Sequence, residues 1–109
     1  MKKFLVLYRS AHSTVERIAK STPEQGQAVM AAWRAWAQRA ARSLVELGAP
    51  LGESTVLKGA SAGPGYIGGF SVVQAESADV AKKIFEGHPH FEAGGNSIEL
   101  LELLAMPGS

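Results

Sequence analysis

The chain has 109 residues, the length of one domain, and it contains no cysteine. Disulfides, cysteine-ligated zinc and thiol catalysis are therefore excluded. The formal net charge is only +1, and the basic residues form no cluster with interleaved aromatic rings, so a nucleic-acid partner is not expected.

The charges are unevenly distributed. Residues 1–58 hold nine lysines and arginines against four glutamates, and residues 59–109 hold two lysines against six acidic residues. We interpret this as complementary charge within one compact domain or dimer. The apolar run over residues 4–8 is too short for a signal peptide, and no segment reaches the roughly 20 apolar residues of a membrane span. We expect a soluble cytoplasmic protein without a membrane partner.

The first predicted element is a strand over residues 3–8. Phe4, Val6 and Tyr8 share one face of this strand, and Leu5 and Leu7 share the other. Because both faces are apolar, the pattern predicts a central strand that is covered on both sides.

A long helix is the clearest element that follows. The stretch before it, SAHSTVERIAK, is predicted as a loop with some helix, in which Ser13 can cap a turn. Thr22 is a good N-cap, Pro23 suits the first helical position, and Gln25 completes a capping box. Gly48 is a natural C-terminal stop. Apolar residues on one face recur at three- and four-residue steps up to it: Val29, Trp33, Trp36, Ala40, Leu44 and Leu47.

The glycine-rich region resembles a nucleotide-binding motif only in its letters. Residues 48–54 are predicted as a turn and residues 55–59 as a short strand. Gly63, Gly65 and Gly68 then match G-x-G-x-x-G. The dinucleotide fingerprint needs a helix at its end, whereas the β-rich sequence FSVVQA follows here. We therefore reject a nucleotide site and predict a hairpin connection.

The remaining elements complete a recognisable order. Residues 70–75 are predicted as a strand, Ser77 as the cap of a helix over residues 78–86, and residues 97–104 as the last strand. Val80, Ile84 and Phe85 are expected to face inward. The order β-α-β-β-α-β is that of the α+β ferredoxin-like unit with an antiparallel sheet. Its helices cover one face of the sheet, so we expect a homodimer that packs sheet on sheet over the other.

The stretch EGHPHFEAGGN, which contains His88 and His90, allows three interpretations. As a turn, Pro89 ends the helix, His88 complements the helix dipole, and the glycines that follow allow the chain to bend. As a catalytic site, His90 or His88 would transfer a proton. As a metal site, the stretch lacks ligands, because only His12, Glu86 and Glu92 remain as candidates. We predict no metal and no other cofactor.

Two further groups of residues are candidates for ligand binding. Trp33 and Trp36 either wall a pocket for a flat small molecule, with Tyr8 beside them, or pack in the core. Arg9 and Arg34 either orient an anionic ligand or are simply exposed.

The chain resembles the YCII-related proteins, which are dimeric α+β barrels. The resemblance rests on FLVLYRS, TPEQGQAVMAAWRAW, LGAPLG, GGFSVVQAESADVA, HPHFEAGGNSIEL and MPG. It implies a single YCII-like domain over residues 1–109 that forms a dimer, and it implies less about activity. Some members pair a buried histidine of the first helix with an aspartate that follows that helix. Here Ala32 and Trp33 stand where that histidine is expected, and GAPLGES contains no aspartate.

Two hypotheses about function remain. The first is a homodimer that binds a small organic molecule, aromatic or anionic, in a cleft between the first helix and the sheet. As an enzyme it would be a cofactor-free lyase or isomerase that uses His90 or His88. The second is a non-catalytic accessory or regulatory dimer that binds another protein. A cavity with a histidine on its wall would favour the first.

Overall fold

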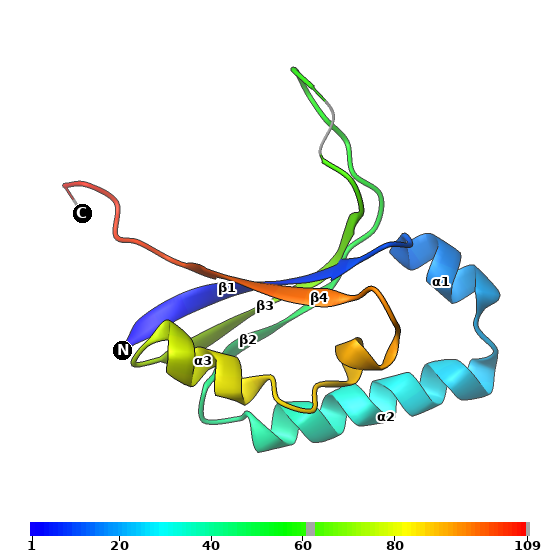
Figure 1. Cartoon of the computed structure of the whole chain (residues 1–109), viewed down its shortest axis with the longest axis horizontal. Coiled ribbons are helices and arrows are strands. Elements are labelled where there is room, and N and C mark those ends of the chain that lie inside the picture. The colour runs from blue at the N-terminus through cyan, green and yellow to red at the C-terminus, as the bar shows by residue number, and fades with distance from the viewer. Residues whose placement is uncertain (61–62, 109) are drawn as a thin grey trace.

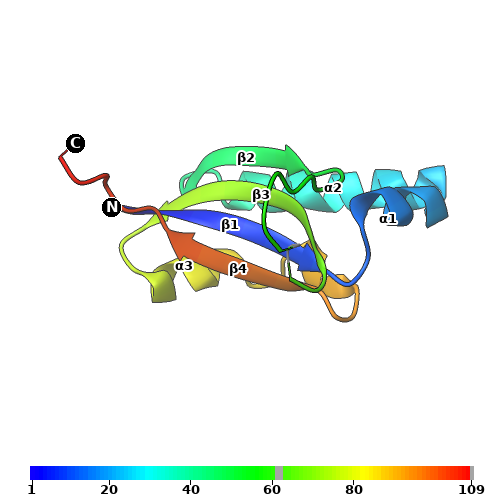
Figure 2. The same ribbon diagram turned by 90° about the horizontal axis from the view of Figure 1, so that it is seen from above.

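The computed structural model describes residues 1–60 and 63–108. Four antiparallel strands form one sheet in the order β2-β3-β1-β4, and the helices cover one of its faces (Figures 1 and 2). This confirms the predicted α+β ferredoxin-like fold. The elements are β1 (Lys2–Ser10), α1 (Thr14–Lys20), α2 (Pro23–Arg39), β2 (Leu44–Pro50), β3 (Tyr66–Ala75), α3 (Ala78–Ile84), the 3-10 helix η1 (Pro89–Glu92) and β4 (Ser97–Glu102).

Strand β1 is central, as predicted, with β3 on one side and β4 on the other. Its alternate residues Phe4, Val6 and Tyr8 are buried under the helices. Leu5 and Leu7 lie on the opposite face, which we call the open face, and are only half-buried. The expected cover on both sides is therefore absent from the described part of a single chain. Residues 51–60, which follow β2, and residues 103–108, which follow β4, lie on the open-face side (Figure 1).

The predicted helix caps are confirmed. The Ser13 hydroxyl accepts from the backbone N–H of Glu16 at 3.1 Å, so the early stretch forms the short helix α1. At α2 the Thr22 hydroxyl accepts from the N–H of Gln25 at 3.1 Å, and the Gln25 side chain accepts from the N–H of Thr22 at 2.9 Å. This reciprocal pair satisfies two backbone donors that the first helical turn leaves without partners.

The prediction that the long helix reaches Gly48 is wrong. Helix α2 ends at Arg39, and residues 44–50 form β2, in which Leu44 pairs with Val73 of β3. Gly48 has φ +80°, and a Cβ there would overlap the carbonyl oxygen of Phe70, so it fits an irregular strand and not a helix end. The expected turn over residues 48–54 is partly strand, and the expected strand over residues 55–59 does not form.

The second half of the chain largely follows the predictions. Strand β3 begins directly after Gly65, so a strand and not a helix follows the glycine motif. Residues 61 and 62 of the predicted connection lie outside the described residues. Ser77 caps α3, and Phe85 is buried. Val80 is 43 % exposed, because Ala81 takes the inward position, so its predicted burial is wrong. No helix in the described ranges is both long enough and apolar enough to cross a membrane.

Candidate functional site

Five of the predicted site residues meet beneath the sheet, between β1, α2 and η1. We call them the aromatic cluster; its members are Tyr8, Trp33, Trp36, His88 and His90. His88 is at its centre, with ring centroids 4.5 Å from Trp33, 4.5 Å from Trp36 and 5.2 Å from Tyr8. The Tyr8 ring is 4.7 Å from Trp33 and 5.4 Å from His90. These are packing distances, so side chains fill the space between α2 and the sheet.

His88 is a buried, neutral acceptor. Its side chain is 1 % exposed, and Nδ1 accepts from the backbone N–H of His90 at 2.9 Å. A neutral imidazole has one N–H, so the proton is on Nε2, which has no partner among the described residues. Burial, with smaller effects of the His90 and Arg39 charges, lowers the pKa of His88 to about 4. The turn interpretation gave His88 a charged role at a helix end, whereas here it caps η1 as an acceptor.

His90 is held in one orientation by two backbone carbonyls. Its Nε2 lies 2.8 Å from the oxygen of Arg9 and 3.1 Å from that of Ser97. Both are acceptors, so Nε2 carries the proton, and in the neutral ring Nδ1 is a lone pair. Nδ1 has no hydrogen bond within the described ranges. Burial lowers the pKa of His90, and the charge of Arg17 lowers it further. The hydrogen bonds to the carbonyls of Arg9 and Ser97 raise the pKa but do not cancel this effect. The ring can therefore accept a proton at Nδ1.

The other polar groups of the aromatic cluster already have partners. The Ser71 hydroxyl donates to the carbonyl of Leu47 at 2.6 Å, so it must accept from the Tyr8 hydroxyl at 2.8 Å. Burial raises the pKa of Tyr8 to about 12. The indole N–H of Trp36 donates to the carbonyl of Ile84 at 2.9 Å. Tyr8 and Trp36 therefore act as core residues, and Trp33, which is half-buried, lies at the cluster's edge.

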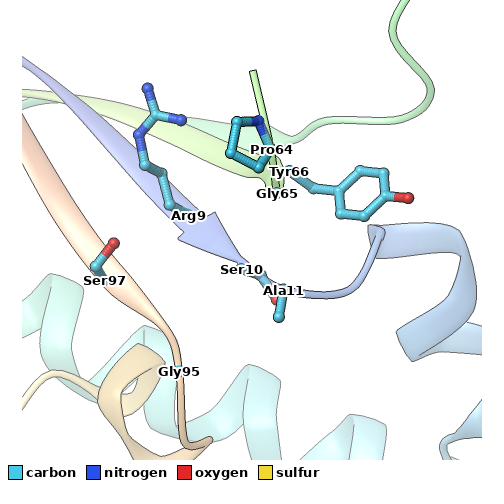
Figure 3. Close-up of a pocket in the computed structure, with 8 residues that line it drawn as sticks. All are labelled: Arg9, Ser10, Ala11, Pro64, Gly65, Tyr66, Gly95 and Ser97. Carbon is cyan, nitrogen blue, oxygen red and sulfur yellow. The ribbon is translucent and has the colours of Figure 1, made fainter. Parts of the chain in front are cut away.

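Arg9 does not join the aromatic cluster. Its side chain points away from the helices and pairs with Glu99 at 2.8 Å (Figure 3). It lines a hollow of about 310 Å³, the Arg9 pocket, at the end of β1. Arg34 is exposed on α2 and does not line this pocket. The pocket is bounded by Arg9, Ser10, Ala11, Pro64, Gly65, Tyr66, Gly95 and Ser97.

His90 and the Arg9 pocket are directly connected. The backbone oxygens of Arg9 and Ser97 accept from His90, and the same two residues line the pocket. His90 therefore lies behind the pocket wall and fixes the ends of β1 and β4 relative to η1. The carbonyl of His90 accepts from the Asn96 side chain at 2.9 Å, which holds the same turn in place.

Two other regions are weaker candidates for a functional site. A hollow of about 440 Å³ lies between α3, η1 and β4, with apolar walls and with Lys82 and Glu86 at its edge, but no histidine lines it. His12 is exposed and contacts Glu16 of α1 at 3.5 Å. In residues 1–60 and 63–108, no group of three or more histidine, aspartate or glutamate side chains is arranged to hold a metal ion.

Arg17 is a polar residue that no pattern in the sequence singles out as functional. It is half-buried on α1, and its Nε is buried without a hydrogen-bond partner among the described residues. An arginine on a short polar helix is usually solvated, so residue type and spacing carry no signal of this environment. The environment depends on Gly68 of β3, which lies against the guanidinium.

The comparisons with known proteins place the chain in a family. By structure it is similar to 5-chloro-2-hydroxyhydroquinone dehydrochlorinase (TftG) from Burkholderia phenoliruptrix AC1100, solved in complex with 2,5-dihydroxybenzoquinone. The TM-score is 0.48, the identity is 21 %, and 91 % of each chain is covered. No curated protein sequence matches the chain. The family described as the YCII-related domain matches residues 3–104. The match covers nearly the whole sequence, and the chain therefore belongs to the YCII-related family.

Proposed function

We propose that this protein binds a small organic anion in the Arg9 pocket. The observation that carries the proposal is an arginine beside a hollow of about 310 Å³ that Tyr66 and Ser97 also line. A guanidinium binds a carboxylate through two parallel hydrogen bonds, and hydroxyl groups can complete the contact. The volume is at the lower end of the range for ligand pockets, which suits a one-ring or short-chain acid.

The Arg9–Glu99 pair does not prevent this role. Both side chains are more than one-third exposed, at 41 % and 46 %. An exposed ion pair contributes little net stability because water and salt screen it. A ligand carboxylate can therefore compete with Glu99 for the guanidinium, or share it.

We also propose that the open face is the contact surface of a homodimer. The strand register places Leu5 beside Val72 and Leu101, and Leu7 beside Phe70. This apolar surface includes a partly exposed leucine, Leu101 at 41 %, and a second copy would remove it from water. Light scattering on the purified chain is expected to give twice the mass of 11.5 kDa. A monomeric mass at micromolar concentration would contradict the dimer.

A second candidate function is cofactor-free proton transfer by His90, as in a lyase or isomerase. The observation in its favour is the fixed tautomer, in which Nε2 donates to two carbonyls and Nδ1 remains a lone pair. Such a ring can take a proton from a bound molecule and return it at another atom. His88 suits this role less, because its Nδ1 is occupied by the N–H of His90.

A thermal-shift experiment with matched variants tests the proposed binding. Benzoate is the probe, phenol is the uncharged comparator, and Arg9→Gln is compared with Arg34→Gln, which removes the same charge from an exposed position of α2. Benzoate is expected to raise the melting temperature of the wild type and of Arg34→Gln. At a hundredfold excess over Kd, the free energy of unfolding is expected to rise by about 2.7 kcal/mol. Arg9→Gln is expected to lose the response.

The outcomes separate the functional classes. An undiminished benzoate response in Arg9→Gln would exclude the Arg9 pocket as the site. No response to a wider panel of carboxylates and phenols in the wild type would favour the accessory or regulatory dimer that binds another protein. Turnover of any hit, abolished in His90→Gln but retained in Arg34→Gln, would establish the proton-transfer function.

A further inference from the structure

We infer that Arg17 and His90 form a second ligand site, distinct from the Arg9 pocket, for a small carboxylate that carries a neighbouring hydroxyl group. This goes beyond the proposed function, because none of the residues that line the Arg9 pocket is Arg17 or His90. The inference starts from a cation that the fold holds in place but does not neutralise.

The Arg17 guanidinium lies against an irregularity in the sheet. The register between β1 and β3 shifts at Tyr8/Arg9, so Gly68 is an extra residue between the partners of these two positions. A Cβ added at Gly68 would lie 2.9 Å from Nη2 of Arg17, so the guanidinium lies directly against this glycine and would have to shift if a side chain were present there. The Thr14 hydroxyl donates to the carbonyl of Gly68 at 3.2 Å and fixes α1 to the same point.

The charge of Arg17 has no counter-ion in the part of the chain that the structure describes. The ion pairs there are Lys2–Glu102, Arg9–Glu99 and His12–Glu16. Glu16, which precedes Arg17 in sequence, is thus directed to His12. The Nε–H of Arg17 is buried with no acceptor among residues 1–60 and 63–108. A half-buried guanidinium without an anion loses part of its hydration, and no ion pair compensates for that cost. A bound carboxylate would offset this cost through the guanidinium donors.

His90 supplies the complementary group. Both residues lie near Tyr8. Its carbonyl oxygen is 3.6 Å from the position of a Cβ at Gly68, against which the Arg17 guanidinium lies, and its ring is 5.4 Å from that of His90. The Arg17 charge also reaches His90, since it helps to lower the pKa of that ring. Because Nε2 of His90 is bound to two carbonyls, the ring offers an acceptor at Nδ1. The ligand must therefore pair an anionic group for Arg17 with a hydroxyl donor for His90.

Nuclear magnetic resonance tests this site directly, through the Nε–Hε signal of Arg17. Glycolate is the probe, and acetate is the comparator that lacks the hydroxyl. In the Arg9→Gln protein, where the other pocket is impaired, glycolate is expected to shift the Arg17 signal saturably. Acetate is expected to bind at least tenfold more weakly. Arg17→Gln is expected to weaken glycolate binding at least tenfold, and Arg34→Gln is expected to leave it unchanged.

Three results would overturn the inference. The first is an Arg17 signal that glycolate does not move in the folded protein, a result that requires no variant. The second is equal glycolate binding in Arg17→Gln and Arg34→Gln. The third is acetate binding as tight as that of glycolate, which would remove His90 from the site. None of these results affects the test of benzoate binding at Arg9, so the two proposals stand or fall separately.

Discussion

Substitution of Trp36 by alanine is expected to lower the free energy of unfolding by about 3–5 kcal/mol, the range for large aromatic side chains removed from a core. Trp36 is 1 % exposed, stacks on Phe85 with ring centroids 5.3 Å apart and packs against His88. Its indole N–H also donates to the carbonyl of Ile84 at 2.9 Å. The substitution therefore leaves a cavity and an unpaired carbonyl where α2 meets α3.

Urea unfolding followed by circular dichroism measures this effect. Trp33→Ala is the matched control, because Trp33 lies on the same helix but is only half-buried, and its loss is expected to be clearly smaller. Trp36→Phe, which keeps much of the ring but not the N–H, is expected to lie between the wild type and Trp36→Ala. If the two alanine variants lost equal stability, Trp36 would not be the centre of the core.

Acidification from pH 7 to pH 4 is expected to remove up to about 3 kcal/mol of stability through His88. The pKa of His88 is lowered from 6.5 to about 4 in the folded protein, and each pKa unit corresponds to about 1.4 kcal/mol. Above pH 6.5 the ring is neutral in both states, so it adds no pH dependence. Between pH 6.5 and 4 the unfolded chain binds the proton and the folded protein does not, so stability falls as the pH falls.

The measurement is the free energy of unfolding in urea at several pH values between 7 and 4. His88→Phe keeps an aromatic ring in the cluster but cannot titrate, so its stability is expected to depend less on pH. Some dependence remains, because the pKa of His90 is also lowered by burial. His12→Gln is the control, since His12 is exposed. Equal pH slopes in His88→Phe and the wild type would show that His88 is not the titrating group.

The two ends of α2 show which parts of the fold are encoded locally. Its start was predictable because Thr22, Pro23 and Gln25 determine the first turn by contacts within four residues. Its end was not, because Leu44 and Leu47 fit a helical spacing as well as a strand. Their conformation is decided by pairing with β3, which lies more than 20 residues further along the chain. Sequence periodicity over a short apolar run does not contain that information.

The candidate site shows the same division. The alternation along β1 places Tyr8 on the same face as Phe4 and Val6, and it places Arg9 on the opposite face. Tyr8 and Arg9 therefore cannot contact the same ligand if both belong to one regular strand. The sequence identified the HPH stretch but not which nitrogens are free, because His90 is fixed by carbonyls from two distant strands. Arg17 depends on a register shift in the sheet, which no local pattern encodes.

The alternation of β1 also separates what this protein can change from what it must keep. Every second residue of the strand belongs to the aromatic cluster and its surroundings, where a change in volume disturbs many neighbours at once. The residues between them face the open side, where Arg9 lines its pocket and Leu7 lies beside Phe70. Mutations on the two sides that share no contacts should have nearly additive effects. New ligand preferences can therefore evolve, or be engineered, on one side of a strand whose other side continues to specify the fold.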